Sequence, residues 1–107
     1  MTKFTLSDLD NIIGERAGFE ASKSYTKSLL DSGMNRVAKK FGEEAVEAVI
    51  AATEKDAEAL AAEAADVMYH LLVMLRCADV PLVRVMAILE ERTSQSGLAE
   101  KASRGST

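Results

Sequence analysis

The sequence has no tryptophan, one proline and only five aromatic residues, two tyrosines and three phenylalanines. Its single cysteine, Cys77, excludes an internal disulfide bond. There is no run of about 18 apolar residues that could form a membrane-spanning helix, and the first eight residues lack the apolar segment of a signal peptide. We therefore expect a soluble, cytoplasmic protein that does not enter a membrane.

An excess of positive charge is also absent. The formal net charge is -4 at pH 7, whereas binding to nucleic acid or to an anionic membrane surface requires a basic face. The composition therefore argues against both kinds of partner.

The residues that dominate are alanine, leucine, glutamate and lysine, all strong helix formers. We expect an all-α protein, an antiparallel bundle of about five helices. One helical domain should span residues 1–95, and residues 96–107 should form a flexible tail. The predicted helices cover about residues 7–16, with Ser7 as N-cap, then 27–31, 34–53, 56–78 and 81–92.

The second half of the fourth predicted helix, residues 67–75, is apolar nearly all round. A helix of this kind is buried on more than one side. In a chain of 107 residues, this pattern predicts an intertwined homodimer.

Two pairs of carboxylates stand three residues apart in the two longest predicted helices. Glu44 and Glu47 share one helix face, and so do Glu63 and Asp66. The short polar turn around Lys55 should make the two helices antiparallel. Because residues equally far from the turn lie side by side, the four acids should meet roughly 12 to 17 Å from it, at 1.5 Å per residue.

Four converging carboxylates repel one another and need compensation. No lysine or arginine stands one helical turn from Glu47, Glu63 or Asp66, and only Glu44 has such a neighbour, Lys40. A bound hard cation would supply the missing positive charge, and oxygen ligands without cysteine suit Mg²⁺ or Mn²⁺.

Three segments of the sequence resemble the phosphoribosyl-ATP pyrophosphatase family of the all-α, MazG-type nucleoside triphosphate pyrophosphohydrolases. They are residues 24–26, residues 40–47 with the pattern ExxE, and residues 63–70 with the pattern ExxD. The resemblance covers about residues 4–95. It implies Mg²⁺-dependent hydrolysis of the α,β-phosphoanhydride of phosphoribosyl-ATP, the second step of histidine biosynthesis, and a functional link to phosphoribosyl-AMP cyclohydrolase.

The resemblance also implies roles for individual residues. The family's metal ligands match Glu44, Glu47, Glu63 and Asp66, one of which would be the general base. Tyr25 would stack on the base or ribose of the substrate, or else only pack in the fold. The basic candidates for contacts with phosphate are Lys39 and Lys40, then Lys23, Lys27 and Arg36, and finally Arg92, for which simple exposure is the alternative.

Two other functions stay open on the sequence alone. A hydrolase that removes non-canonical or deoxy nucleotides would share the acidic motif and the fold. A dimeric helical interaction module would carry the same acids as surface decoration, with no enzymatic role.

Overall fold

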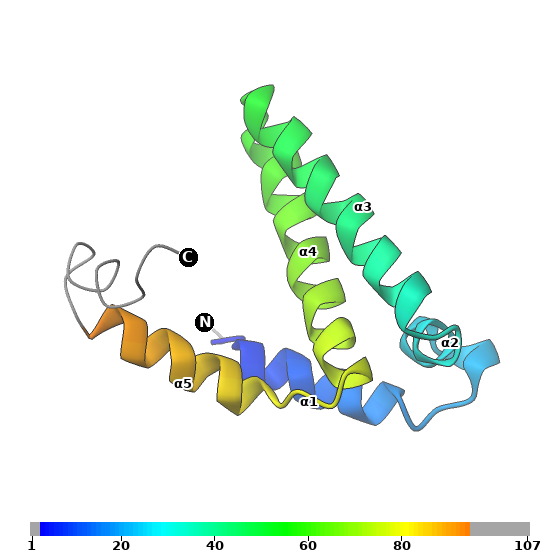
Figure 1. The fold of residues 1–107 in the computed structure, drawn as a ribbon. Helices are drawn as coiled ribbons and strands as arrows, with labels where there is room; N and C mark the ends of the chain where they lie inside the picture. The colour runs from blue at the N-terminus through cyan, green and yellow to red at the C-terminus, as the bar shows by residue number, and fades with distance from the viewer. Residues whose placement is uncertain (1–2, 95–107) are drawn as a thin grey trace.

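The computed structural model describes residues 3–94 and is all-α, with no strand in that part of the chain. The prediction of an all-α protein with five α-helices is confirmed. The predicted tail, residues 96–107, lies outside the described residues. In order, the elements are α1 (Leu6–Arg16), a short 3₁₀ helix η1 (Ala21–Lys23), α2 (Tyr25–Asp31), α3 (Met34–Thr53), α4 (Ala57–Cys77) and α5 (Leu82–Thr93) (Figure 1).

The two longest helices, α3 and α4, form an antiparallel hairpin that rises from α1 and α2 (Figure 1). The turn between them is short. Lys55 adopts a left-handed backbone conformation with φ of 58°, and the Asp56 side chain accepts a hydrogen bond from the Ala59 N–H at 3.0 Å, which caps α4. This turn ends one helix and starts the next within three residues, so it sets the register between them.

The core lies where α1 and α2 meet the open end of the hairpin. Each of the five α-helices contributes at least one buried residue to this cluster. The burial of these apolar side chains holds α1 and α2 against the hairpin. The buried members are Ile13, Leu29, Val37, Leu72, Val73 and Leu82.

The starts of α1 and α2 differ from the sequence prediction. Ser7 is not the N-cap of α1; Thr5 is, because its side chain and that of Asp8 each accept a hydrogen bond from the other's backbone N–H, at 3.1 and 3.0 Å. The second helix was predicted to begin at about residue 27. Instead Ser24 caps α2 by accepting a hydrogen bond from the Lys27 N–H at 3.1 Å, so Tyr25 and Thr26 belong to the helix.

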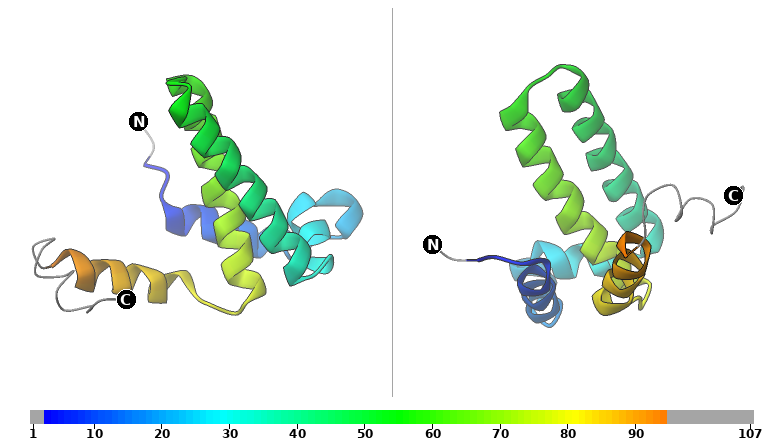
Figure 2. Two further views of the ribbon diagram at one scale, coloured as in Figure 1. Left: turned by 45° about the horizontal axis from the view of Figure 1, so that its top comes forward. Right: turned by 90° about the vertical axis from the view of Figure 1, so that its left-hand side faces the viewer.

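The last helix, α5, projects away from the rest of the chain (Figures 1 and 2). Of its residues only Leu82 is buried, and the large apolar residues Ile88 and Leu89 are exposed. A single chain therefore does not complete a five-helix bundle. The Cα radius of gyration of 16.1 Å likewise exceeds the value of about 13 Å typical of a compact domain of this length.

Candidate active site

Three of the four predicted carboxylates converge between α3 and α4. Glu44, Glu63 and Asp66 each place a carboxylate oxygen within 4.8 Å of the others. Glu44 comes from α3, whereas Glu63 and Asp66 come from one face of α4, three residues apart. The antiparallel register of the hairpin produces this meeting, as the spacing from the turn predicted.

The fourth carboxylate, Glu47, is exposed and interacts with Glu44 and Glu63. Hydrogen bonding with Glu44 and then that group's negative charge raise the pKa of Glu47, while the interaction with Glu63 acts in the opposite direction. The pKa shift is a sign that negative charge is crowded at this point.

The donor set fits a hard divalent cation. Glu63 Oε2 is buried and has no hydrogen-bond partner in the described part of the chain, and a buried carboxylate oxygen without a partner is costly. None of the ion pairs found within residues 3–94 involves one of the four acids: Lys40 lies 3.6 Å from Glu43 rather than from Glu44. Mg²⁺ and Mn²⁺ prefer oxygen ligands such as these carboxylates.

A pocket of about 760 Å³ opens beside the acids on the outer side of α3. It is lined by Lys40, Gly42, Glu44 and Glu47, among others. A Cβ atom built on Gly42 would meet no atom within 4 Å. In the part of the chain that the structure describes, no other element packs against this glycine, so the space is open to another molecule.

His70 connects the acidic site to α2. Its Nδ1 donates a hydrogen bond to the Asp66 carbonyl oxygen at 2.8 Å, and its Nε2 lies 3.3 Å from the Tyr25 hydroxyl. A carbonyl oxygen can only accept, so the neutral ring carries its proton on Nδ1 and accepts from Tyr25 on Nε2. Nothing in the sequence indicated this contact between Tyr25 and His70, because the two residues lie 45 positions apart.

A second contact between α2 and α4 was also missed. The Thr26 hydroxyl is hydrogen-bonded to the Tyr69 hydroxyl, and Thr26 is almost fully buried. The segments 24–26 and 63–70 both carried the family resemblance, but nothing in their spacing indicated that they touch.

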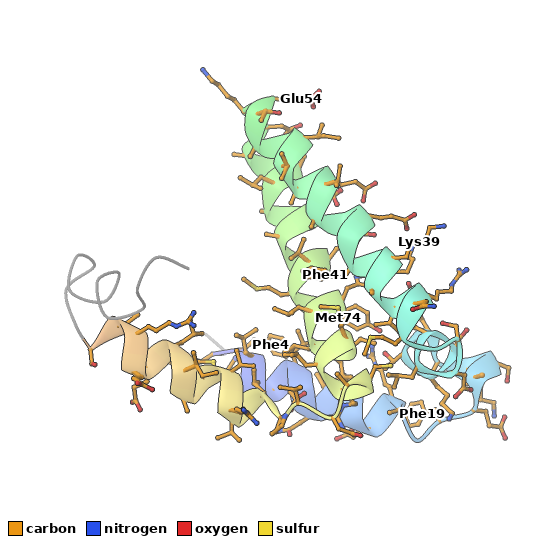
Figure 3. The ribbon with its side chains drawn as sticks, in the orientation of Figure 1. Phe4, Phe19, Lys39, Phe41, Glu54 and Met74 are labelled. Atoms are coloured by element: carbon orange, nitrogen blue, oxygen red, sulfur yellow. The ribbon has the colours of Figure 1, made fainter. Side chains whose placement is uncertain are left out.

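The predicted basic residues are only partly gathered at the acids. Lys40 lines the pocket. Lys39 and Arg36 are exposed on α3, and Lys39 projects outward from it (Figure 3). Lys27 forms an ion pair with Asp31 at 2.8 Å.

The two remaining basic candidates lie outside α3. Lys23 is on η1. Arg92 is near the end of α5, on the arm that projects from the hairpin (Figure 1), so a single chain does not bring it to the acidic site.

No helix within residues 3–94 is both long and apolar enough to cross a membrane.

The helical fold and the carboxylates that converge from two antiparallel helices have the layout of an all-α nucleoside triphosphate pyrophosphohydrolase. Residues 6–93 match the family model described as phosphoribosyl-ATP pyrophosphohydrolase. The chain is 58% identical over 104 residues to the phosphoribosyl-ATP pyrophosphatase of Methylobacterium nodulans, with 97% of each chain covered. It is 54% identical over 107 residues to that of Rhizobium johnstonii, with both chains fully covered. The chain belongs to the phosphoribosyl-ATP pyrophosphohydrolase family, which confirms the resemblance drawn from the motifs.

Proposed function

We propose that this chain hydrolyses the α,β-phosphoanhydride of phosphoribosyl-ATP to give phosphoribosyl-AMP and pyrophosphate, the second step of histidine biosynthesis. The observation that carries the proposal is the family match over residues 6–93, which includes all four carboxylates. We place the reaction in the cytoplasm, where phosphoribosyl-AMP cyclohydrolase would consume the product.

The metal would be held by Glu44, Glu63 and Asp66, whose oxygens already lie within 4.8 Å of one another. A bound Mg²⁺ or Mn²⁺ supplies positive charge to the phosphate oxygens and lowers the pKa of a coordinated water. Glu47 is the candidate general base, because it is exposed and lies outside the group of three that would bind the metal. A carboxylate not committed to the metal can accept the proton of the attacking water.

The phosphate chain would lie in the pocket beside α3. Lys40 lines this pocket together with Glu44 and Glu47, so its ammonium group can contact phosphate oxygens as a point charge. Lys39 and Arg36 stand nearby on the same helix and would add positive potential. Lys27 and Arg92 stay weaker candidates, because Lys27 is paired with Asp31 and Arg92 lies on the projecting arm.

The chain would work as a homodimer. Large apolar side chains are exposed on two helices. Val46 and Val49 lie on α3, and Val83, Met86 and Leu89 lie on α5. Exposed apolar surface of this extent is typical of a protein interface. A second copy is the occupant we propose, because a projecting amphipathic helix on each copy can cover the apolar face of the other.

The test is release of pyrophosphate from phosphoribosyl-ATP, with and without Mg²⁺, by the wild type and by Glu47→Gln. We expect release that requires the metal and is lost in the variant. Glu54→Gln, which changes an exposed glutamate at the far end of the hairpin, should keep wild-type activity. Failure of the folded wild type to release pyrophosphate, together with release from deoxynucleoside triphosphates, would favour the nucleotide-removing alternative. No metal-dependent hydrolysis of either substrate would favour the interaction module.

A further inference from the structure

A second pocket, of about 470 Å³, is lined by Tyr25 and by none of the four acids. Its lining comes from four parts of the chain: the end of α1, the following loop with η1, the start of α2, and α4. The contributing side chains that could meet a ligand are Arg16, Phe19, Lys23, Tyr25 and Tyr69. The resemblance implied substrate contacts for Tyr25 and Lys23, but the reaction proposed above assigns no part of the substrate to this pocket.

Three aromatic rings face the pocket, which is notable in a chain with only five. Phe19, on the loop after α1 (Figure 3), and Tyr25 are 50% and 55% exposed. Tyr25 and Tyr69 are stacked, with ring centroids 6.3 Å apart and an angle of 25° between the rings. Their hydroxyls are held by His70 and Thr26, so the two rings are fixed, and the exposed parts of Phe19 and Tyr25 are available to a flat or cyclic ligand.

The charge of the pocket is positive, although the chain as a whole is negative. Arg16 and Lys23 line it, and no carboxylate does. The Arg16 guanidinium forms no ion pair within residues 3–94. Lys23 lies 3.9 Å from Glu20 with both side chains about three-quarters exposed, a contact that contributes little. The pocket therefore suits a ligand that carries an anionic group next to a ring, and a phosphorylated sugar has both parts.

Two hydrogen bonds connect the pocket to the acidic site. Tyr25 lines the pocket, its hydroxyl lies 3.3 Å from His70, and His70 is bonded to the backbone of Asp66. We infer that this pocket binds the phosphoribosyl group of phosphoribosyl-ATP, with Arg16 and Lys23 on its 5-phosphate and the aromatic rings against the ribose.

This inference rests on the proposed function and makes it more specific. The substrate carries a triphosphate at one end and a sugar monophosphate at the other, and the metal site can account only for the first. An ordinary nucleoside triphosphate carries no phosphate apart from its triphosphate. The pocket would therefore let the enzyme discriminate the substrate of this family from the substrates of the nucleotide-removing hydrolases.

Binding can be measured directly with ribose 5-phosphate as the probe. The chain has no tryptophan and only two tyrosines, and both line this pocket, so its tyrosine fluorescence reports on the site. We expect a saturable change with ribose 5-phosphate. Arg16→Gln and Lys23→Gln should each weaken the binding about tenfold, since a charged hydrogen bond is lost. Arg16→Lys should retain most of it, and Lys55→Gln, at the far turn, should bind as the wild type does.

The kinetic counterpart uses phosphoribosyl-ATP. Arg16→Gln and Lys23→Gln should raise KM about tenfold and leave kcat within about twofold, because the group they bind is remote from the bond that breaks. A wild type that releases no pyrophosphate would overturn the proposed function itself. An active wild type that shows no response to ribose 5-phosphate, with unchanged KM in both variants, would overturn only the pocket assignment. Equal binding of ribose without phosphate would overturn the role of the two cations.

Discussion

The α3–α4 hairpin and helix α5 are both amphipathic, but within the described residues only the helices of the hairpin pack against each other along their length. The two hairpin helices lie side by side along most of their length, whereas α5 extends away from them (Figure 2). Val83 on α5 is 74% exposed, while Val73 on α4 is fully buried. The same residue type is thus solvent-exposed on one helix and part of the core on the other.

The geometry of the acidic site and the association of two chains therefore depend on different regions of the molecule. The carboxylates are brought together by the register of a local hairpin, so their geometry does not depend on where α5 lies. Among residues 3–94 the apolar surface of α5 is left uncovered, and exposed apolar area of this kind is stabilised by association. Substitutions in the two regions should therefore change different measurable properties.

The largest effect is expected at the acidic site. Glu63→Gln removes a ligand from the proposed metal site, and we expect the rate of pyrophosphate release to fall on the order of 10³-fold. A direct ligand should matter more than outer partners of a metal, whose loss costs roughly 10–100-fold. The variant should also lose the rise in melting temperature that Mg²⁺ gives the wild type by mass action, with its association state unchanged. Retained activity, or a Mg²⁺ response equal to that of the wild type, would remove Glu63 from the site.

A charge placed on α5 should instead change the association state of the protein. Met86→Glu would leave an unpaired carboxylate in the proposed interface, at a cost of about 3 kcal/mol, so the dimer should dissociate at concentrations where the wild type stays associated. Sedimentation equilibrium measures this change, with Lys55→Glu as a control that alters charge far from α5. A dimer of undiminished affinity would show that α5 is not at the interface.

The hairpin could be predicted from the sequence because its determinants are local. The apolar spacing, the short polar turn and the i,i+3 pairs of acids together specify two helices, their direction and their register. The meeting of Glu44 with Glu63 and Asp66 follows from counting residues from Lys55. The metal itself remains a prediction, since it rests on donor chemistry and not on the fold.

The parts that were not predicted depend on contacts between distant residues. The start of α2 was misplaced because Ser24 looks like any loop serine; in the structure it caps the helix and also donates to the Arg16 carbonyl at 3.0 Å. The contact of Tyr25 with His70 has no local signature. The exposure of Ile88 and Leu89 could not be foreseen either, because helical periodicity indicates which face is apolar but not which molecule covers it.

Gly42 offers a milder test of the outer face of α3. Because a Cβ atom there meets nothing within 4 Å, Gly42→Ala should stabilise the helix by about 1 kcal/mol, measured by urea denaturation. Gly14→Ala in α1 is the matched comparison, since its Cβ would lie 3.1 Å from the Arg76 guanidinium and should gain less or lose stability. Destabilisation by Gly42→Ala would indicate that a second copy packs against this point of α3.

The smallest effect is expected at the turn that sets the hairpin register. Lys55 has φ of 58°, a conformation that glycine adopts without strain, but glycine also gains entropy in the unfolded chain. Lys55→Gly should therefore stabilise the protein by only about 0.5 kcal/mol and leave activity unchanged, because the register is kept. Glu54→Gly, at a neighbouring position with φ of -82°, has no strain to relieve and should destabilise. If Lys55→Gly also destabilised, the turn would owe its geometry to the lysine side chain, and the register that aligns Glu44 with Asp66 would depend on more than the backbone.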